Sequence, residues 1–336
     1  MADLSDTSAF HSVAGGKSIR KKITPYLYLV PAFLVMGVIT FYPMGYQLWM
    51  SLTDYGVGNL RFDAPAPNMV GFTNYVRILT SNLGLSNFNF WRMLGFNLFW
   101  TFSNVFIHVA LGIIIAVILN TEGLWFKRFY RAIYILPIII PQIIIANIFR
   151  NMFDPDYGAI NQGLALIGRI IGLSPNLFHI RWIDQIDYPI AGIPLTLSYF
   201  ALLITNIWLG WPFMTIVATG ALQSIPKELY ESADIDGASG LQKFRQITLP
   251  LIRPAMIPAA VYGIVVTFNL FTLIYFLSGG GPIRRTEILL TSAFRLVNEQ
   301  RLYGVAAAFG AYIFLILLGL TLLTNVITRA TESYDV

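Results

Sequence analysis

Six long apolar runs alternate with polar segments along the chain. They lie at about residues 25–52, 93–119, 129–153, 193–218, 255–277 and 305–327. A helix needs roughly 20 mostly apolar residues to cross the hydrocarbon layer of a membrane, and each run reaches that length. The pattern therefore predicts an all-α membrane protein with six transmembrane helices. It leaves a polar arm at 1–24 and a short tail at 331–336.

The composition agrees with a membrane protein, because 56% of the 336 residues are hydrophobic and only 12% are charged. The arm is basic, and we interpret its cations as an anchor that sets the orientation in the membrane rather than as a site for nucleic acid. All lysines of the chain fall on the side of the membrane that the arm would occupy. This asymmetry predicts that both termini are cytoplasmic.

Acidic residues avoid the middle of every apolar run, since all 17 Asp and Glu lie in tails, loops or the ends of runs. Carriers driven by protons or sodium ions normally hold a carboxylate inside the membrane. An ion-coupled secondary solute transporter is therefore kept as an alternative, although it would lack the intramembrane carboxylate that such carriers normally use. A membrane-bound enzyme or scaffold is a third hypothesis. It ranks last because the chain has no cysteine and no H-E-x-x-H or G-x-S-x-G motif.

No nucleotide site or other cofactor site is expected in this chain. The stretch "GGKS" at 15–18 resembles the end of a phosphate-binding loop, but His11 stands where the first glycine of that loop belongs. Energy for any active process must then come from another chain.

Uncharged polar side chains remain inside the apolar runs, next to aromatic rings. Amides and hydroxyls can bond the hydroxyl groups of a sugar, and rings can pack on its C–H faces. The simpler interpretation is that most of them bond between helices, and for His108 we prefer that role over ligand binding. The group includes Asn97, Asn104, Gln142, Asn147, Ser198, Asn206, Tyr262, Thr267 and Asn269.

The polar segment 226–250 separates two apolar runs and predicts a bent helical hairpin. Gly237 can end a first helix, and Ser239 with Gln242 forms a capping box for a second one. We expect Pro250 and Pro254 to kink or interrupt the chain where the next span begins. A protruding hairpin of this kind suits the docking of a cytoplasmic partner.

The same segment carries a family motif. The residues Glu231-Ser232-Ala233, Gly237, Ile247, Leu249 and Pro250 fit the pattern E-A-A-x-x-x-G-x9-I-x-L-P, with Ser232 as the departure. Together with "NIWLGWPFM" and "LSGGGPIRRT", they make the chain resemble the permeases of binding-protein-dependent ABC importers for sugars. The resemblance covers about 25–330 and is greatest to the first permease subunit of maltose-type systems.

This resemblance implies a type I ABC importer permease fold over 25–330, in the prokaryotic plasma (inner) membrane. It implies a multi-pass transport subunit for an oligosaccharide such as maltose, maltodextrin or trehalose, or for a polyol, and no enzyme activity of its own. The implied partners are a second homologous permease, an ATPase dimer that holds ATP and Mg, an extracytoplasmic solute-binding protein, the sugar, and membrane lipid. The implied ATPase-coupling residues are Glu231, Ala233, Asp236, Gly237, Ile247, Leu249 and Pro250.

The resemblance also places substrate-binding residues midway through the membrane. They are Asn206, Leu209, Gly210 and Phe213 on one span, and Tyr262 and Asn269 on the span after the hairpin. Phe213 stands where maltose permeases carry a tyrosine, and Val266 where they carry a polar residue. These departures leave room for another disaccharide or a polyol beside maltose.

Overall fold

The computed structural model describes residues 12–121, 123–188 and 194–328, and these residues are almost entirely helical. Among them the only strand-like pairing is the isolated bridge between Thr53 and Met69. The predicted tail at 331–336 and the first part of the arm lie outside the described residues. The rest of the arm is helical, because the first helix begins at Ser12.

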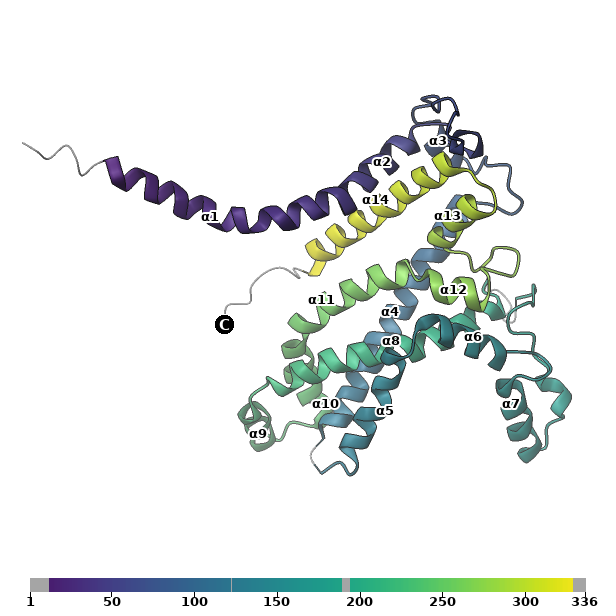
Figure 1. Ribbon diagram of the computed structural model, residues 1–336. Helices are drawn as coiled ribbons and strands as arrows, with labels where there is room; N and C mark the ends of the chain where they lie inside the picture. The colour runs from purple at the N-terminus through teal and green to yellow at the C-terminus, as the bar shows by residue number, and fades with distance from the viewer. Residues whose placement is uncertain (1–11, 122, 189–193, 329–336) are drawn as a thin grey trace, which may run out of the picture.

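The elements follow one another as helices joined by connections of different lengths, with the long ones at residues 52–72 and 171–196 (Figure 1). The α-helices are α1 (Ser12–Met36), α2 (Tyr42–Ser51), α3 (Thr73–Leu79), α4 (Phe90–Asn120), α5 (Lys127–Ile139), α6 (Gln142–Met152), α7 (Ala159–Ile170), α8 (Leu197–Gln223), α9 (Lys227–Ile235), α10 (Gly240–Lys243), α11 (Leu249–Phe268), α12 (Phe271–Leu277), α13 (Leu289–Asn298) and α14 (Tyr303–Thr328). Two π-helical turns, η1 (Gly37–Phe41) and η4 (Phe244–Thr248), and two 3-10 turns, η2 (Val57–Leu60) and η3 (Pro175–Phe178), complete the list.

Within the described residues, five helical segments are long and apolar enough to cross a membrane. They are Thr24–Ser51, Phe90–Asn120, Leu197–Gln223, Gly240–Phe268 and Tyr303–Val326. The pair formed by α5 and α6 passes the same test as one unit, which gives the sixth span.

This sixth span, predicted at about 129–153, is not one continuous helix but a bent pair. The axes of α5 and α6 differ by 98° at a break around Pro141. Ile140 has the extended backbone that the residue before a proline prefers, and Pro141 has no N–H with which to continue the helix.

The centre of the molecule is formed by α4, α8 and α11. Helix α4 packs along α8, and α11 packs against both. Gly112 of α4 permits this closeness, because a side chain there would overlap Met214 of α8. The three helices share an apolar cluster near the end that carries α9 and α10, made of Ile113, Ala116, Met214, Ala218, Leu222, Ile225, Ile252, Met256 and Ala259.

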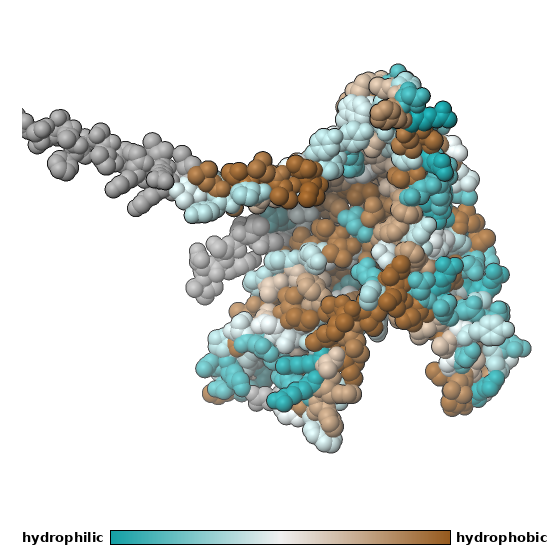
Figure 2. All heavy atoms as spheres, viewed as in Figure 1, coloured by the Kyte–Doolittle hydropathy of each residue, from teal (hydrophilic) through white to brown (hydrophobic). Residues whose placement is uncertain are grey.

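The first span projects away from this centre (Figure 1), and apolar atoms cover much of its surface (Figure 2). Only its second half, α2, lies against α14. None of the most apolar window of Thr24–Ser51 is buried inside the chain. Lipid or another protein must therefore cover this span.

Candidate functional site

A cavity of about 260 Å³ lies where α4, α8 and α11 meet the break between α5 and α6. The described residues that line it combine two amides, two hydroxyls and an imidazole with apolar and aromatic groups. They are His108, Pro137, Ile138, Ile140, Gln142, Asn206, Leu209, Gly210, Phe213, Met214, Tyr262, Gly263, Val266, Thr267 and Leu270.

Five of the six residues predicted to bind substrate line this cavity. Asn206, Leu209, Gly210 and Phe213 enter it from α8, and Tyr262 enters from α11. The sixth, Asn269, does not line it. Asn269 follows the last residue of α11, and its amide donates to the carbonyl of Val265 at 3.4 Å.

One wall of the cavity is a buried polar link between α4 and α8. His108 Nε2 lies 2.9 Å from the carbonyl oxygen of Asn206, and Asn206 Nδ2 donates to Asn104 Oδ1 at 2.8 Å. The expected role of His108 as an interhelical hydrogen-bond partner is thus confirmed. Because the amide group of Asn206 is held by Asn104, the Oδ1 of Asn206 is the side-chain atom left to accept a bond from a ligand.

Gly210 of α8 lies directly against His108 of α4. A Cβ atom at Gly210 would overlap the ring of His108. The glycine therefore fixes the distance between α4 and α8 and thereby the position of the imidazole.

The opposite wall is aromatic and faces outward. The rings of Phe213 and Tyr262 lie 5.5 Å apart at an angle of 52°, on α8 and α11. Phe213 is 37% exposed and Tyr262 is 58% exposed. Such a pair can pack on the C–H face of a sugar while the tyrosine hydroxyl bonds to one of its hydroxyl groups.

The sequence named Gln142 and Thr267 only within the larger group of uncharged polar residues in the apolar runs, and it did not single out Ile140. Gln142 and Ile140 reach the cavity because the chain turns sharply at Pro141. The only hint in the sequence is that this apolar run contains Pro137 and Pro141, since a proline can break a membrane helix where neighbouring groups satisfy the freed backbone.

The segment 226–250 forms the predicted hairpin. The first helix, α9, ends at Ile235, and Gly237 follows with a φ angle of +73°. The capping box is confirmed, since Ser239 N–H donates to Gln242 Oε1 at 2.7 Å and Gln242 N–H donates to Ser239 Oγ at 3.4 Å. Figure 1 places α9 and α10 at the end of the bundle opposite to α3.

Two contacts fix the hairpin on the bundle. The hydroxyls of Tyr230 and Thr248 lie 2.9 Å apart, and Lys243 forms an ion pair with Asp234 across the bend. Because these contacts join α9 to the start of the next span, the hairpin and the span can move as one body.

The residues predicted for coupling are mostly at the surface of this hairpin. Glu231, Asp236, Gly237, Leu249 and Pro250 are exposed, whereas Ala233 and Ile247 are half-buried. The sequence did not single out two apolar side chains at the tip, Ile235 at 88% and Leu241 at 64% exposure. Their exposure outside the spans marks a surface that another protein can cover.

Pro250 and Pro254 were predicted to kink or interrupt the chain, and of these two outcomes the interruption is wrong. The helix that starts at Gly240 continues through both prolines to Phe268. The wide turn η4 precedes Pro250, and there Leu249 N–H bonds to the carbonyl of Phe244, five residues back. The local change of helix type leaves room for the proline without a break.

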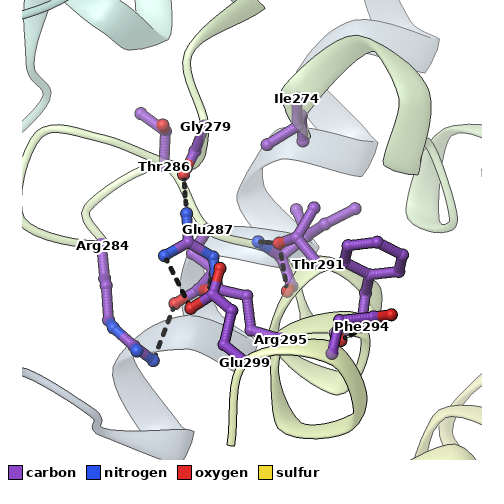
Figure 3. A network of polar contacts seen from close by, with 12 residues as sticks. Ile274, Gly279, Arg284, Thr286, Glu287, Thr291, Phe294, Arg295 and Glu299 are labelled. Atoms are coloured by element: carbon purple, nitrogen blue, oxygen red, sulfur yellow. Dashed lines mark hydrogen bonds and ion pairs between the residues drawn. The ribbon is translucent and has the colours of Figure 1, made fainter. Parts of the chain in front are cut away.

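A buried charged cluster lies at the other end of the molecule (Figure 3). The side chain of Glu287 is inaccessible to solvent, with Oε2 at 3.5 Å from Arg284 Nη1 and Oε1 at 3.3 Å from Arg295 Nε. Arg295 also donates to the carbonyl of Gly279. Burial raises the pKa of Glu287, although the two guanidinium groups oppose the shift. The cluster ties the loop after α12 to helix α13.

The sequence of the chain is similar to those of known transport proteins. Residues 108–333 match the family described as "Binding-protein-dependent transport system inner membrane component". The galactooligosaccharides transport system permease protein GanP of Bacillus subtilis (strain 168) is 33% identical over 292 residues, which cover 84% of this chain and 65% of that protein. The chain therefore spans slightly less than two thirds of the length of that relative.

A second relative matches over nearly its whole length. The trehalose/maltose transport system permease protein MalF of Thermococcus litoralis is 33% identical over 297 residues, which cover 88% of this chain and 90% of that protein. Among solved structures, a chain of a bacterial alginate ABC transporter, crystallised with a periplasmic protein bound to an alginate pentasaccharide, superposes with a TM-score of 0.75. It is 22% identical, and the match covers 95% of this chain and 99% of that chain.

Proposed function

Because the chain belongs to the family of binding-protein-dependent transport system inner membrane components, we propose that it is the permease subunit of an ATP-driven importer for a neutral oligosaccharide or polyol. The observation that carries the proposal is the cavity shared by α4, α8 and α11, with its amide wall and its aromatic wall. The named relatives transport galactooligosaccharides and trehalose or maltose, which are neutral saccharides.

The chemistry of the cavity favours an uncharged substrate. None of the described residues that line it is an Asp, Glu, Lys or Arg. The alginate transporter shares the fold but imports an acidic polysaccharide. Binding an acidic sugar normally uses arginine or lysine, so this chain fits a neutral sugar better. Asn206 Oδ1, Gln142, Thr267 and the Tyr262 hydroxyl would bond the sugar hydroxyls, and Phe213 would pack on its ring.

The size of the cavity favours a shared substrate site. At about 260 Å³ it falls below the ~300–1,000 Å³ typical of ligand pockets. Its aromatic wall is partly exposed, so a second, homologous permease facing Phe213 and Tyr262 would complete it. A solute-binding protein would deliver the sugar from the outer side.

The hairpin of α9 and α10 would couple this site to a pair of ATPase subunits, which would hold ATP and Mg. Glu231 is exposed, and no residue in the described part of the chain forms an ion pair with it. A cation of the ATPase would pair with Glu231, while Ile235 and Leu241 would enter an apolar cleft. In this arrangement the hairpin and both termini lie in the cytoplasm.

An ion-coupled mechanism is not favoured. The family depends on a binding protein, and the cavity offers no carboxylate among its described lining residues to carry a proton or sodium ion.

Reconstitution tests the proposal. The tagged chain is purified from membranes of its host together with its bound subunits and placed in liposomes that contain ATP. We expect uptake of labelled maltose, trehalose or galactooligosaccharides that depends on ATP and on a binding protein, and no uptake of oligoalginate.

Glu231→Lys should abolish uptake without loss of the protein from the membrane, because a reversed charge faces the ATPase cation. Glu228→Lys, a matched change one turn earlier, should retain more activity. Uptake by the isolated chain that follows an ion gradient would overturn the proposal.

A further inference from the structure

A second cavity, of about 670 Å³, lies between α4, α5 and α8 and shares only Pro137 with the lining of the site above. It is lined by apolar and aromatic side chains, and Ile118, Ile133 and Leu136 at its edge are about half exposed. We call it the lateral groove. The described residues that line it are Ile115, Ile118, Leu119, Leu124, Tyr130, Ile133, Tyr134, Leu136, Pro137, Trp208 and Trp211.

The lateral groove has the length of one membrane leaflet. It extends along α5 from Leu124, just before the helix, to Pro137. Ten residues of helix separate Lys127 from Pro137, a rise of roughly 15 Å at 1.5 Å per residue. Half of the ~30 Å hydrocarbon core has the same thickness. An acyl chain that starts beside Lys127 therefore ends near Trp208 and Trp211.

Three cations lie next in sequence to the Leu124 end of this groove, where a lipid headgroup would lie. Lys127, Arg128 and Arg131 are the first, second and fifth residues of α5, close in sequence to Leu124 and Tyr130 of the lining. No carboxylate in the described part of the chain forms an ion pair with any of the three. This end of the molecule also carries α9 and α10 (Figure 1).

The orientation rule for membrane proteins accounts for basic residues on this side, but not for their position beside an apolar groove. Basic residues next to a cleft between membrane helices suit the headgroup of an anionic lipid. We propose that the lateral groove binds an anionic phospholipid, with one acyl chain along α5 and the phosphate held by Lys127, Arg128 and Arg131. A helix of another protein fits less well, because it would have to place a row of carboxylates at one membrane surface.

Fluorescence quenching by brominated lipids tests the proposal directly, since Trp208 and Trp211 line the deep end of the groove. The purified assembly is reconstituted in phosphatidylcholine vesicles that contain a minor fraction of brominated phosphatidylglycerol, or the same fraction of brominated phosphatidylcholine. The signal of Trp208 and Trp211 is the difference between the wild type and the variant Trp208→Phe/Trp211→Phe. We expect phosphatidylglycerol to compete about fivefold better than phosphatidylcholine for each cation in contact with it.

A variant without the three cations tests headgroup recognition separately from binding of the acyl chain in the groove. Lys127→Gln/Arg128→Gln/Arg131→Gln should lose the preference for phosphatidylglycerol while quenching by brominated phosphatidylcholine persists. The matched control Arg245→Gln/Arg253→Gln removes exposed cations from the start of the span that contains α11, and it should keep the preference.

Two results of the quenching experiment would overturn the proposal. Equal quenching of the wild type by both lipids would mean that the headgroup is not recognised. No quenching of Trp208 and Trp211 by either lipid would mean that a helix of a partner subunit fills the groove. These comparisons need only the wild-type assembly and the tryptophan reference, so they stand even if the charge variant fails to fold.

Discussion

The contact between Gly210 and His108 predicts a specific loss of stability in the variant Gly210→Ala. The added Cβ would overlap the ring of His108, which cannot move away freely because its Nε2 bonds to the carbonyl of Asn206 at 2.9 Å. Inserting a methyl group into a packed interior costs about 1–3 kcal/mol. If the ring rotates instead, the lost interhelical hydrogen bond costs about 0.6 kcal/mol, and the cavity changes shape.

A second glycine of the same helix provides the matched control. Nothing lies within 4 Å of a Cβ atom at Gly220, so Gly220→Ala adds the same methyl group without a clash. Both variants gain the better helix propensity of alanine, about 1 kcal/mol. The difference between them therefore isolates the overlap with His108.

The assay is thermal unfolding of the purified chain in detergent at one fixed heating rate, because unfolding of such proteins is commonly irreversible. We expect Gly210→Ala to melt about 2–6 °C below Gly220→Ala, from 1–3 kcal/mol at roughly 2 °C per kcal/mol. Combining Gly210→Ala with His108→Ala should recover part of the loss, as residues in direct contact do not act additively. If Gly210→Ala melts as high as Gly220→Ala, the packing reasoning is refuted.

Three further predictions concern the cavity, the hairpin and the charged cluster. Phe213→Tyr should lower the KM for uptake of a disaccharide about 2- to 10-fold, because a second hydroxyl beside Tyr262 adds one hydrogen bond of about 0.5–1.5 kcal/mol, and an unchanged KM would contradict this orientation of the ring. Ser239→Ala should speed hydrogen exchange of the Gln242 amide about fivefold, since an N-cap is worth about 1 kcal/mol, whereas Ser232→Ala, inside α9, should not. Because burial raises the pKa of Glu287, the folded state binds its proton more tightly than the unfolded state, so the stability from this carboxyl is complete below the ordinary value of 4.5 and is lost as the pH rises through the folded pKa. The melting temperature of the wild type relative to Glu287→Gln should therefore fall with rising pH, and a rise would show that the arginines outweigh the burial.

Local rules in the sequence were enough for the spans and the hairpin. The length of the apolar runs determines the spans. The capping pair of Ser239 and Gln242, together with Gly237, determines the hairpin. Both depend on residues a few positions apart, so one sequence suffices to see them.

The break in the third apolar run was not predictable in the same way. Pro212 and Pro258 lie inside continuous membrane helices, whereas Pro141 ends one. A proline breaks a membrane helix only where neighbouring groups can satisfy the freed backbone, which depends on packing with distant helices. The same limit hid Gln142 from the cavity and Glu287 from Arg295, because those contacts join separate elements.

The wide turn η4 also contains one residue that the following helix does not need for its rotational phase. Each residue turns an α-helix by about 100°, and a π-helical turn holds one residue more than an α-helical turn of the same rise. Deleting a single residue within Phe244–Thr248 would therefore restore regular α-helical winding and leave Tyr262 in line with Phe213. The base of the hairpin can thus change in length during evolution while the wall of the cavity stays as it is.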